Sequence, residues 1–174
     1  MKSSDGFVQG YNCQAAVDEA YQIVIAEAVT NQPPDVEHFV PMLERIVDNC
    51  ARMPDETSAD AGYFSESNVV KALARGVDPH IATGRRRHDE PAPMVRGRTP
   101  HGLTMKDLMA RKLATNRGAR VYSRRKVIVE PAFGQIKNRG FRHFLLRGLA
   151  KVRGEWSLMT MTHNLLKLHR FQPA

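Results

Sequence analysis

The sequence predicts a single α/β domain in which helices pack on the faces of one mixed sheet. Strand-type and helix-type patterns alternate along the chain, which begins with a strand–turn–strand pattern typical of an antiparallel pair. The chain has 174 residues, of which 42% are apolar, and this suits one domain with its own core. We therefore treat residues 1–174 as one domain.

Four strands are expected, each a short segment of apolar or small residues bounded by turn or proline residues. The first two should form a hairpin around the turn at residues 18–20, and the prolines after Gln32 end the second. The four segments are residues 11–17, 22–29, 57–60 and 79–83.

Helices are expected where apolar residues recur at intervals of three and four. Asp35 is a plausible N-cap for the first helix; Ser65 is expected to cap the second and Gly76 to end it. The helical segments are residues 35–50, 66–75, 105–114, 121–138 and 155–169.

Two segments show neither the strand periodicity nor the helical periodicity of apolar residues. Residues 1–10 are polar and contain glycine, which predicts an unpaired lead-in. Residues 84–103 are rich in Arg, Pro and Gly, which predicts a flexible basic loop or insertion. Its run of three arginines, residues 85–87, could contact a DNA backbone or be a solvated loop.

The charge of the chain points to a polyanionic partner. The formal net charge is +8, and most of the arginines follow Arg85, whereas the acids concentrate in the first 60 residues. Cys13 and Cys50 lie far apart, which predicts a reducing, cytoplasmic location without a disulfide framework. No apolar segment approaches the ~20 residues of a membrane span, so no membrane partner is expected.

Two acids have unusual surroundings. Asp60 follows an expected strand among small residues, and Gly62 would let the chain turn sharply beside it. A simple turn or capping role explains Asp60 as well. Glu130 is the only acid between Asp107 and Glu155, in a segment rich in Lys and Arg. Glu130 is consistent with two roles: an ion-paired helix residue, or a metal ligand beside a DNA phosphate.

Helical geometry places Tyr122, Lys126, Glu130 and Lys137 within one sector of about 80°. Pro131 complicates this helix, because it removes a backbone donor and could kink the helix or start it at Glu130. Asp60 and Glu130 are suitable but incomplete ligands for the metal pair that cuts phosphodiesters, which needs several carboxylates around metals about 4 Å apart.

Several motifs, in order, resemble those of insertion-sequence DDE transposases. Residues 59–63 (ADAGY) resemble the second-aspartate motif. Tyr122, Arg125, Glu130 and Lys137 are similar to the Tyr/Arg/Glu/Lys signature around the catalytic glutamate. Matches to one branch of the group extend over residues 10–18, 129–137, 139–142, 144–148 and 163–168, so the resemblance covers nearly the whole chain.

The resemblance implies a ribonuclease H-like mixed sheet with flanking helices and a Mg²⁺ (or Mn²⁺) bound by an Asp-Asp-Glu triad. Asp60 would be the second member and Glu130 the third, and both would be catalytic and metal-binding. Tyr122, Arg125 and Lys137 would hold double-stranded DNA at the transposon end. A homodimer is a further expectation of the resemblance.

The sequence departs from the family pattern in two ways. The interval from Arg125 to Glu130 is one residue longer than usual, so Lys126 could take the arginine's place. The first aspartate, which the family carries on an early strand, has no counterpart: Asp5 is outside a strand and Asp18 falls in the hairpin turn. The chain is therefore expected to be the C-terminal part of a catalytic domain that lacks its first strand.

The predicted function is DNA transposition, by metal-dependent cleavage and transfer of DNA strands. Because one metal ligand is missing, the alternatives are a non-catalytic fragment that binds DNA or a transposase subunit, and an inert remnant of a decayed element. Three further cations, Arg139, Arg142 and Arg147, lie beside apolar residues and far from acids, and are expected to contact DNA phosphates.

Overall fold

The fold is built from short strands covered by helices on both sides. It is known from a computed structural model, which describes residues 2–3, 6–7, 10–84 and 95–171. Strands β3 (Asn12–Val17) and β4 (Val24–Thr30) form an antiparallel hairpin. Strands β5 (Glu56–Ala59) and β6 (Asp78–Ile81) form a parallel pair, joined by helix α2 (Glu66–Ala74).

The strands do not form one sheet. Among the described residues they make three separate two-stranded sheets, and no ladder joins β3 to β5. One continuous mixed sheet is thus not present among the described residues, whereas the α/β class with flanking helices is confirmed. The physical reason is that no described strand lies between the hairpin and the parallel pair to complete the ladder.

The lead-in is also paired rather than unpaired. Strands β1 (Lys2–Ser3) and β2 (Gly6–Phe7) form a small antiparallel ladder of their own.

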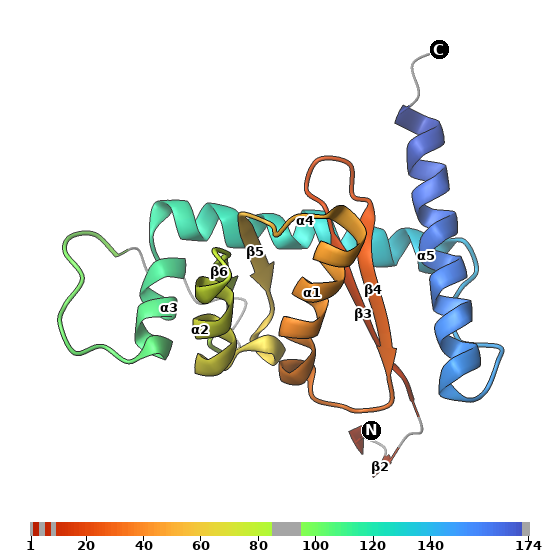
Figure 1. Ribbon diagram of the computed structural model, residues 1–174, viewed down its shortest axis with the longest axis horizontal. Coiled ribbons are helices and arrows are strands. Elements are labelled where there is room, and N and C mark those ends of the chain that lie inside the picture. The colour runs from red at the N-terminus through yellow and green to blue at the C-terminus, as the bar shows by residue number, and fades with distance from the viewer. Residues whose placement is uncertain (1, 4–5, 8–9, 85–94, 172–174) are drawn as a thin grey trace.

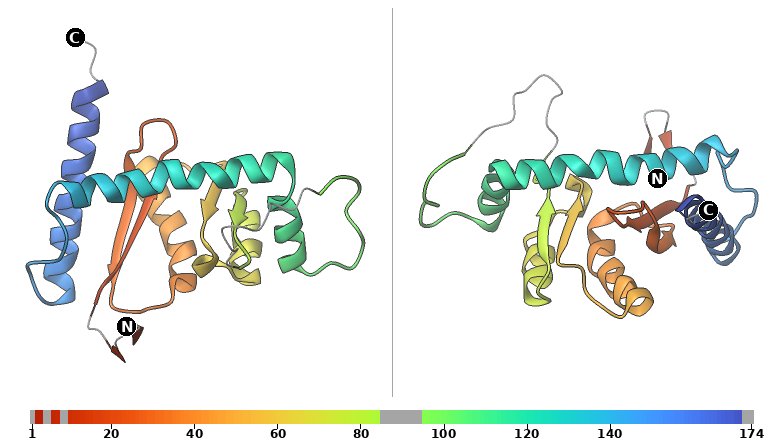
Figure 2. Two further views of the ribbon diagram at one scale, coloured as in Figure 1. Left: turned by 180° about the vertical axis from the view of Figure 1, so that it is seen from behind. Right: turned by 90° about the horizontal axis from the view of Figure 1, so that it is seen from above.

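Helices lie on both sides of the strands (Figures 1 and 2). The 23-residue helix α4 (Asn116–Asn138) crosses one side of the β3–β4 hairpin and of the β5–β6 pair. Helices α1 (Phe39–Cys50) and α2 lie on the other side. Helix α3 (Met105–Leu113) precedes α4, and α5 (Leu149–Phe171) packs along the β3–β4 hairpin. Two short 3₁₀ helices, η1 (Asp35–His38) and η2 (Ala61–Tyr63), precede α1 and α2.

The core has two parts, one on each side of the β3–β4 hairpin. One joins α1, α2, α3, β4 and β6, and Leu43, Val69 and Ile81 are almost completely buried in it. The other joins α4 and α5 to the opposite face of the hairpin through Ile136, Val152 and Trp156, and Phe133 stacks on the Trp156 ring. The second part therefore holds α4 against the β3–β4 hairpin.

The expected helices are all present, with one correction to a predicted cap. Ser65 caps α2 by accepting the amide of Asn68, as predicted, and Gly76 follows with a φ of +77°. Asp35 caps no helix. Its carboxylate instead accepts the side-chain amides of Asn12 (2.6 Å) and Gln14 (2.9 Å), because those amides approach from β3.

Candidate functional site

Asp60 lies at the carboxyl end of β5, as predicted. Its backbone is extended (φ −73°, ψ 173°) and precedes η2, and about half of its side chain is exposed. One carboxylate oxygen, Oδ2, accepts from Arg125 Nη1 at 3.1 Å. The carboxylate is therefore presented to solvent at the end of a strand, with one cation already beside it.

Arg125 is held by Asp60 and by an aromatic ring. Its side chain is only 16% exposed, and its guanidinium carbon lies 5.6 Å from the centre of the Tyr122 ring. A cation at this distance from a ring face is attracted to it. Arg125 therefore positions Asp60 against α4. The family motif implied only that Arg125 holds DNA, so this contact with Asp60 was not predicted.

Gly62, beside Asp60, lies close to Asp35 rather than at a sharp turn. Its φ is not positive; instead, a Cβ on Gly62 would lie 2.7 Å from Asp35 Oδ2. Asp35 belongs to a polar network with Asn12 and Gln14, and Gln14 also accepts a hydrogen bond from the Tyr63 hydroxyl. Burial, together with the nearby charges of Asp35 and Asp60, raises the Tyr63 pKa, so this hydroxyl stays a donor.

Glu130 lies on α4 and is exposed, five residues beyond Arg125. It has no ion-pair partner within 4.0 Å in the part of the chain that the structure describes. At about 100° per residue, Lys126, Glu130 and Lys137 fall within about 40° of one another on the helix. They share one flank of α4, whereas Arg124, which pairs with Glu19 in the hairpin turn, occupies the other.

Pro131 does not interrupt α4. A proline at this position deprives the Val127 carbonyl of its usual helical donor. The side-chain amide of Gln22, from the β3–β4 turn, donates to that carbonyl at 2.8 Å instead. Gln22 also accepts from Lys167 Nζ at 2.7 Å, so one side chain joins the turn, α4 and α5. No sequence pattern pointed to Gln22.

The remaining predicted DNA-binding residues lie on α4 and on the segment leading to α5, and we call them the cationic surface. All five are exposed and make no ion pair within the described ranges. They are Lys126, Lys137, Arg139, Arg142 and Arg147. Unpaired exposed cations of this kind are the groups that polyanions attract. The arginine run at residues 85–87 lies outside the described residues.

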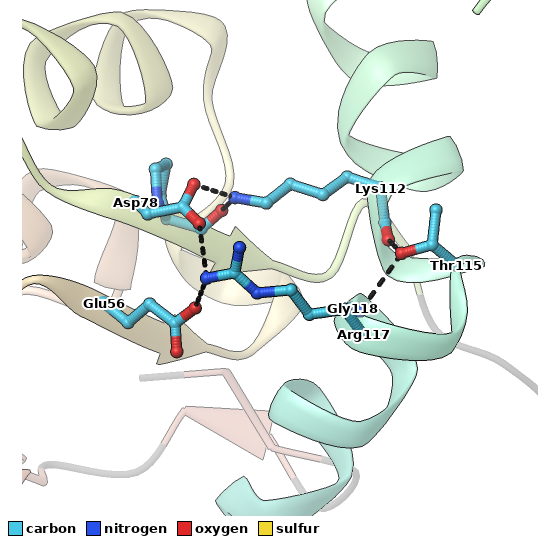
Figure 3. Close-up of polar contacts among 7 residues, drawn as sticks. Glu56, Asp78, Lys112, Thr115, Arg117 and Gly118 are labelled. Atoms are coloured by element: carbon cyan, nitrogen blue, oxygen red, sulfur yellow. Dashed lines mark hydrogen bonds and ion pairs between the residues drawn. The ribbon is translucent and has the colours of Figure 1, made fainter. Parts of the chain in front are cut away.

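A second acidic cluster lies at the opposite end of the β5–β6 pair. Ligand atoms of Glu56, Asp78 and His80 lie within 4.8 Å of one another. Figure 3 shows that two cations already contact the carboxylates: Lys112 pairs with Asp78, and Arg117 with Glu56 and Asp78 (3.7 Å to the latter). Two cations balance two anions, so we interpret the cluster as a link between the strands and the α3–α4 junction.

Comparison with known proteins gives the family. A family model described as "Transposase DDE domain" matches residues 2–165. No curated protein and no solved structure matches the chain. None of the described helices is both long and apolar enough to cross a membrane. The match extends over most of the chain, including both predicted acids, and the chain belongs to the DDE-domain transposase family.

Proposed function

We propose that this chain acts in DNA transposition through metal-dependent cleavage and transfer of DNA strands, with Asp60 and Glu130 as metal ligands. The proposal rests on one observation. Asp60 lies at the end of β5 and contacts α4, the helix that carries Glu130. Family membership supports the transposition role.

Two exposed acids on or beside α4 support the proposal of a shared ion. β5 ends at the side of the fold opposite the β3–β4 turn, and Glu130 occupies the flank of α4 opposite Arg124, which pairs with that turn. Asp60 is held at α4 through Arg125, and Glu130 is exposed five residues further along the same helix. Mg²⁺ takes one or two protein carboxylates and keeps several waters, so two exposed carboxylates are a chemically suitable donor set.

When bound, the ion would supply an activated water and would stabilise charge on the phosphate. The chain's own residues position these groups. Arg125 holds Oδ2 of Asp60, so Oδ1 would be the oxygen available to the ion. The cations on the same flank, Lys126 and Lys137, would hold the DNA backbone while Tyr122 supports Arg125.

We also propose that the domain has a ribonuclease H-like arrangement and that a first aspartate completes the metal site. The described residues supply two of the three expected carboxylates, and we propose that the third arrives on a strand outside the described residues. A homodimer bound to DNA is proposed on the same family resemblance.

A second function, DNA binding without cleavage, is favoured by one observation. The five cations of the cationic surface are exposed and unpaired within the described ranges, whereas Asp60 is already paired with Arg125. Binding of a DNA backbone by such cations needs no metal.

Both functions require DNA on the cationic surface, and this can be tested with charge-matched variants. K137A/R142A and R45A/K71A each remove two exposed cations, the second pair from α1 and α2 on the other side of the fold. Affinity for a double-stranded oligonucleotide is measured by fluorescence anisotropy between about 50 and 300 mM salt. Two lost phosphate contacts should flatten the slope of log K against log salt by about 1.8 in K137A/R142A only. Equal slopes in the two variants would overturn the assignment.

A further inference from the structure

The loop between α4 and α5, residues 139–148, carries two leucines that are exposed to solvent. Leu145 is 80% exposed, more than any other large apolar side chain in the described part of the chain, and Leu146 is 47% exposed. Figure 2 shows this loop at one end of the molecule, between the end of α4 and the start of α5. Single exposed leucines are common on protein surfaces, so the shape and charge of the loop decide what these two can do.

The backbone of the loop is fixed by one carboxylate and one hydroxyl. Glu155, near the start of α5, accepts the amide of Leu145 through Oε1 (2.8 Å) and the amide of Leu146 through Oε2 (3.0 Å). Gly148 adopts a φ of +88°, and its amide donates to the Tyr11 hydroxyl at 3.0 Å. The two-leucine segment is therefore tied to α5 and to the residue that precedes β3.

Aromatic packing holds the same loop from the inside. Phe144 packs edge-to-face against Tyr11 and Phe141, with ring centres 5.7 and 5.1 Å apart. Phe141 also lies beside Trp156, in the part of the core that joins α4 and α5 to the hairpin. The loop thus packs its two phenylalanines inward and leaves both leucines exposed. A loop held in this way loses little conformational freedom when it binds a partner, so the leucines are preorganised for contact.

The surroundings of the leucines are cationic. Residues 131–174 contain one acid, Glu155, and the loop amides engage both of its oxygens. Arg142 and Arg147 lie on either side of the leucines in sequence; both are exposed and make no ion pair with a described residue. A second copy of the chain would bring the same cations to this contact and be repelled, whereas a polyanion would be attracted. Charge therefore favours DNA as the partner of the loop.

The loop continues directly from the part of α4 that carries Glu130. Asn138, the last residue of α4, lies eight residues beyond Glu130, which corresponds to about 12 Å of helix, the length of roughly three to four base pairs. Lys137, in the cationic surface, lies just before the loop. A duplex held on this part of α4 would therefore meet the loop a few base pairs from Glu130.

We propose that Leu145, supported by Leu146, is a wedge that enters the minor groove of double-stranded DNA and separates two stacked base pairs. Proteins that bend DNA insert apolar side chains in this way, and the gap kinks the duplex by about 20–90°. Arg142 and Arg147 hold the phosphates beside the gap. This role rests on the proposed function, in which DNA lies on the cationic surface, but it assigns the bending of the duplex to uncharged residues.

The test compares an intact duplex with the same duplex carrying one abasic site, where the stack of bases is already broken. Fluorescence anisotropy at about 100 mM salt gives the affinity of the full chain for each. A wedge enters the abasic duplex without unstacking a base pair, so we expect at least about fivefold tighter binding of that duplex. Energy transfer between dyes at the two ends of the intact duplex should rise on binding, because a kink brings the ends together.

Variants of the same charge separate the wedge from the phosphate contacts. L145A/L146A should lose both the preference for the abasic duplex and the bend, while the slope of log K against log salt stays that of the wild-type chain. L165A/L168A removes two exposed leucines from α5 and is the matched control, which should keep the preference and the bend. Leu145→Phe retains a large apolar side chain at the tip and should keep them too.

The outcomes distinguish this proposal from the proposed function. Equal affinity of the wild-type chain for the two duplexes, or a preference that persists in L145A/L146A, overturns the wedge, while salt-dependent binding still supports DNA on the cationic surface. Binding that does not weaken with salt overturns both. If sedimentation shows a dimer that L145A/L146A converts to a monomer with the DNA bend unchanged, the leucines belong to a contact between copies and the wedge is overturned.

Discussion

At the scale of single residues, Gln22 connects the parts of the fold that surround the site. Its side chain donates to the Val127 carbonyl that Pro131 leaves without a helical donor, and it accepts from Lys167. Its own carbonyl bonds to Nε2 of the buried His163, whose pKa is lowered by burial, so the neutral ring donates. Gln22 adopts a φ of +58°, a strained value for a residue other than glycine.

We therefore expect Gln22→Ala to destabilise the chain by about 1–2 kcal/mol, the usual cost of leaving a partly buried hydrogen-bonding group unsatisfied. Urea unfolding measures the change. Gln32→Ala, which removes an exposed amide without a side-chain bond, is the matched control and should change stability little. In a Pro131→Ala background α4 regains its own donor, so the cost of Gln22→Ala should shrink. An equal cost in both backgrounds would contradict this role.

At the scale of elements, the start of α4 is fixed by close packing against the end of α3. A Cβ at Gly118 would lie 2.0 Å from the backbone carbonyl oxygen of Lys112, which the backbone cannot yield cheaply. Thr115 caps the helix by accepting the Gly118 amide at 3.1 Å, and its hydroxyl donates to the same Lys112 carbonyl (Figure 3). This junction sets the direction in which α4 crosses the strands.

Gly118→Ala should therefore cost about 2 kcal/mol or more, because the added methyl group forces the two helices apart. Gly134→Ala, in the same helix with open space around it, should instead stabilise the chain by up to about 1 kcal/mol through helix propensity. Thermal unfolding of the two variants gives the comparison. The account of the junction is wrong if both alanines shift the melting temperature in the same direction.

The elements also show what sequence periodicity can predict. The spacing of apolar residues predicted the elements β3, β4, α1, α2 and α5. Each of them buries one face, and this produces a regular apolar pattern in its own sequence. Pairing between strands depends on a neighbour, so the split into separate sheets could not be predicted from local pattern. Asp35 appeared to be a helix cap because its contacts with Asn12 and Gln14 come from more than 20 residues away.

At the scale of the whole molecule, Asp60, Glu130 and most of the predicted DNA-binding cations lie on α4 or beside it. Asp60 was identified from its small neighbours and Glu130 from its isolation among cations, and both lie beside or on this helix. What sequence could not anticipate is the pairing of Arg125 with Asp60, since it depends on a tertiary contact.

The central claim is that Asp60 and Glu130 share a divalent ion, and Mn²⁺ binding tests it most directly. Mn²⁺ replaces Mg²⁺ at oxygen sites, and the paramagnetic resonance of free Mn²⁺ reports its concentration. Asp60→Asn and Glu130→Gln should each weaken Mn²⁺ binding by about tenfold or more, whereas Asp48→Asn, which alters an exposed carboxylate on α1, should not. If Glu56→Gln or His80→Gln weakens binding while Asp60→Asn leaves it unchanged, the ion belongs to the other acidic cluster and the claim fails.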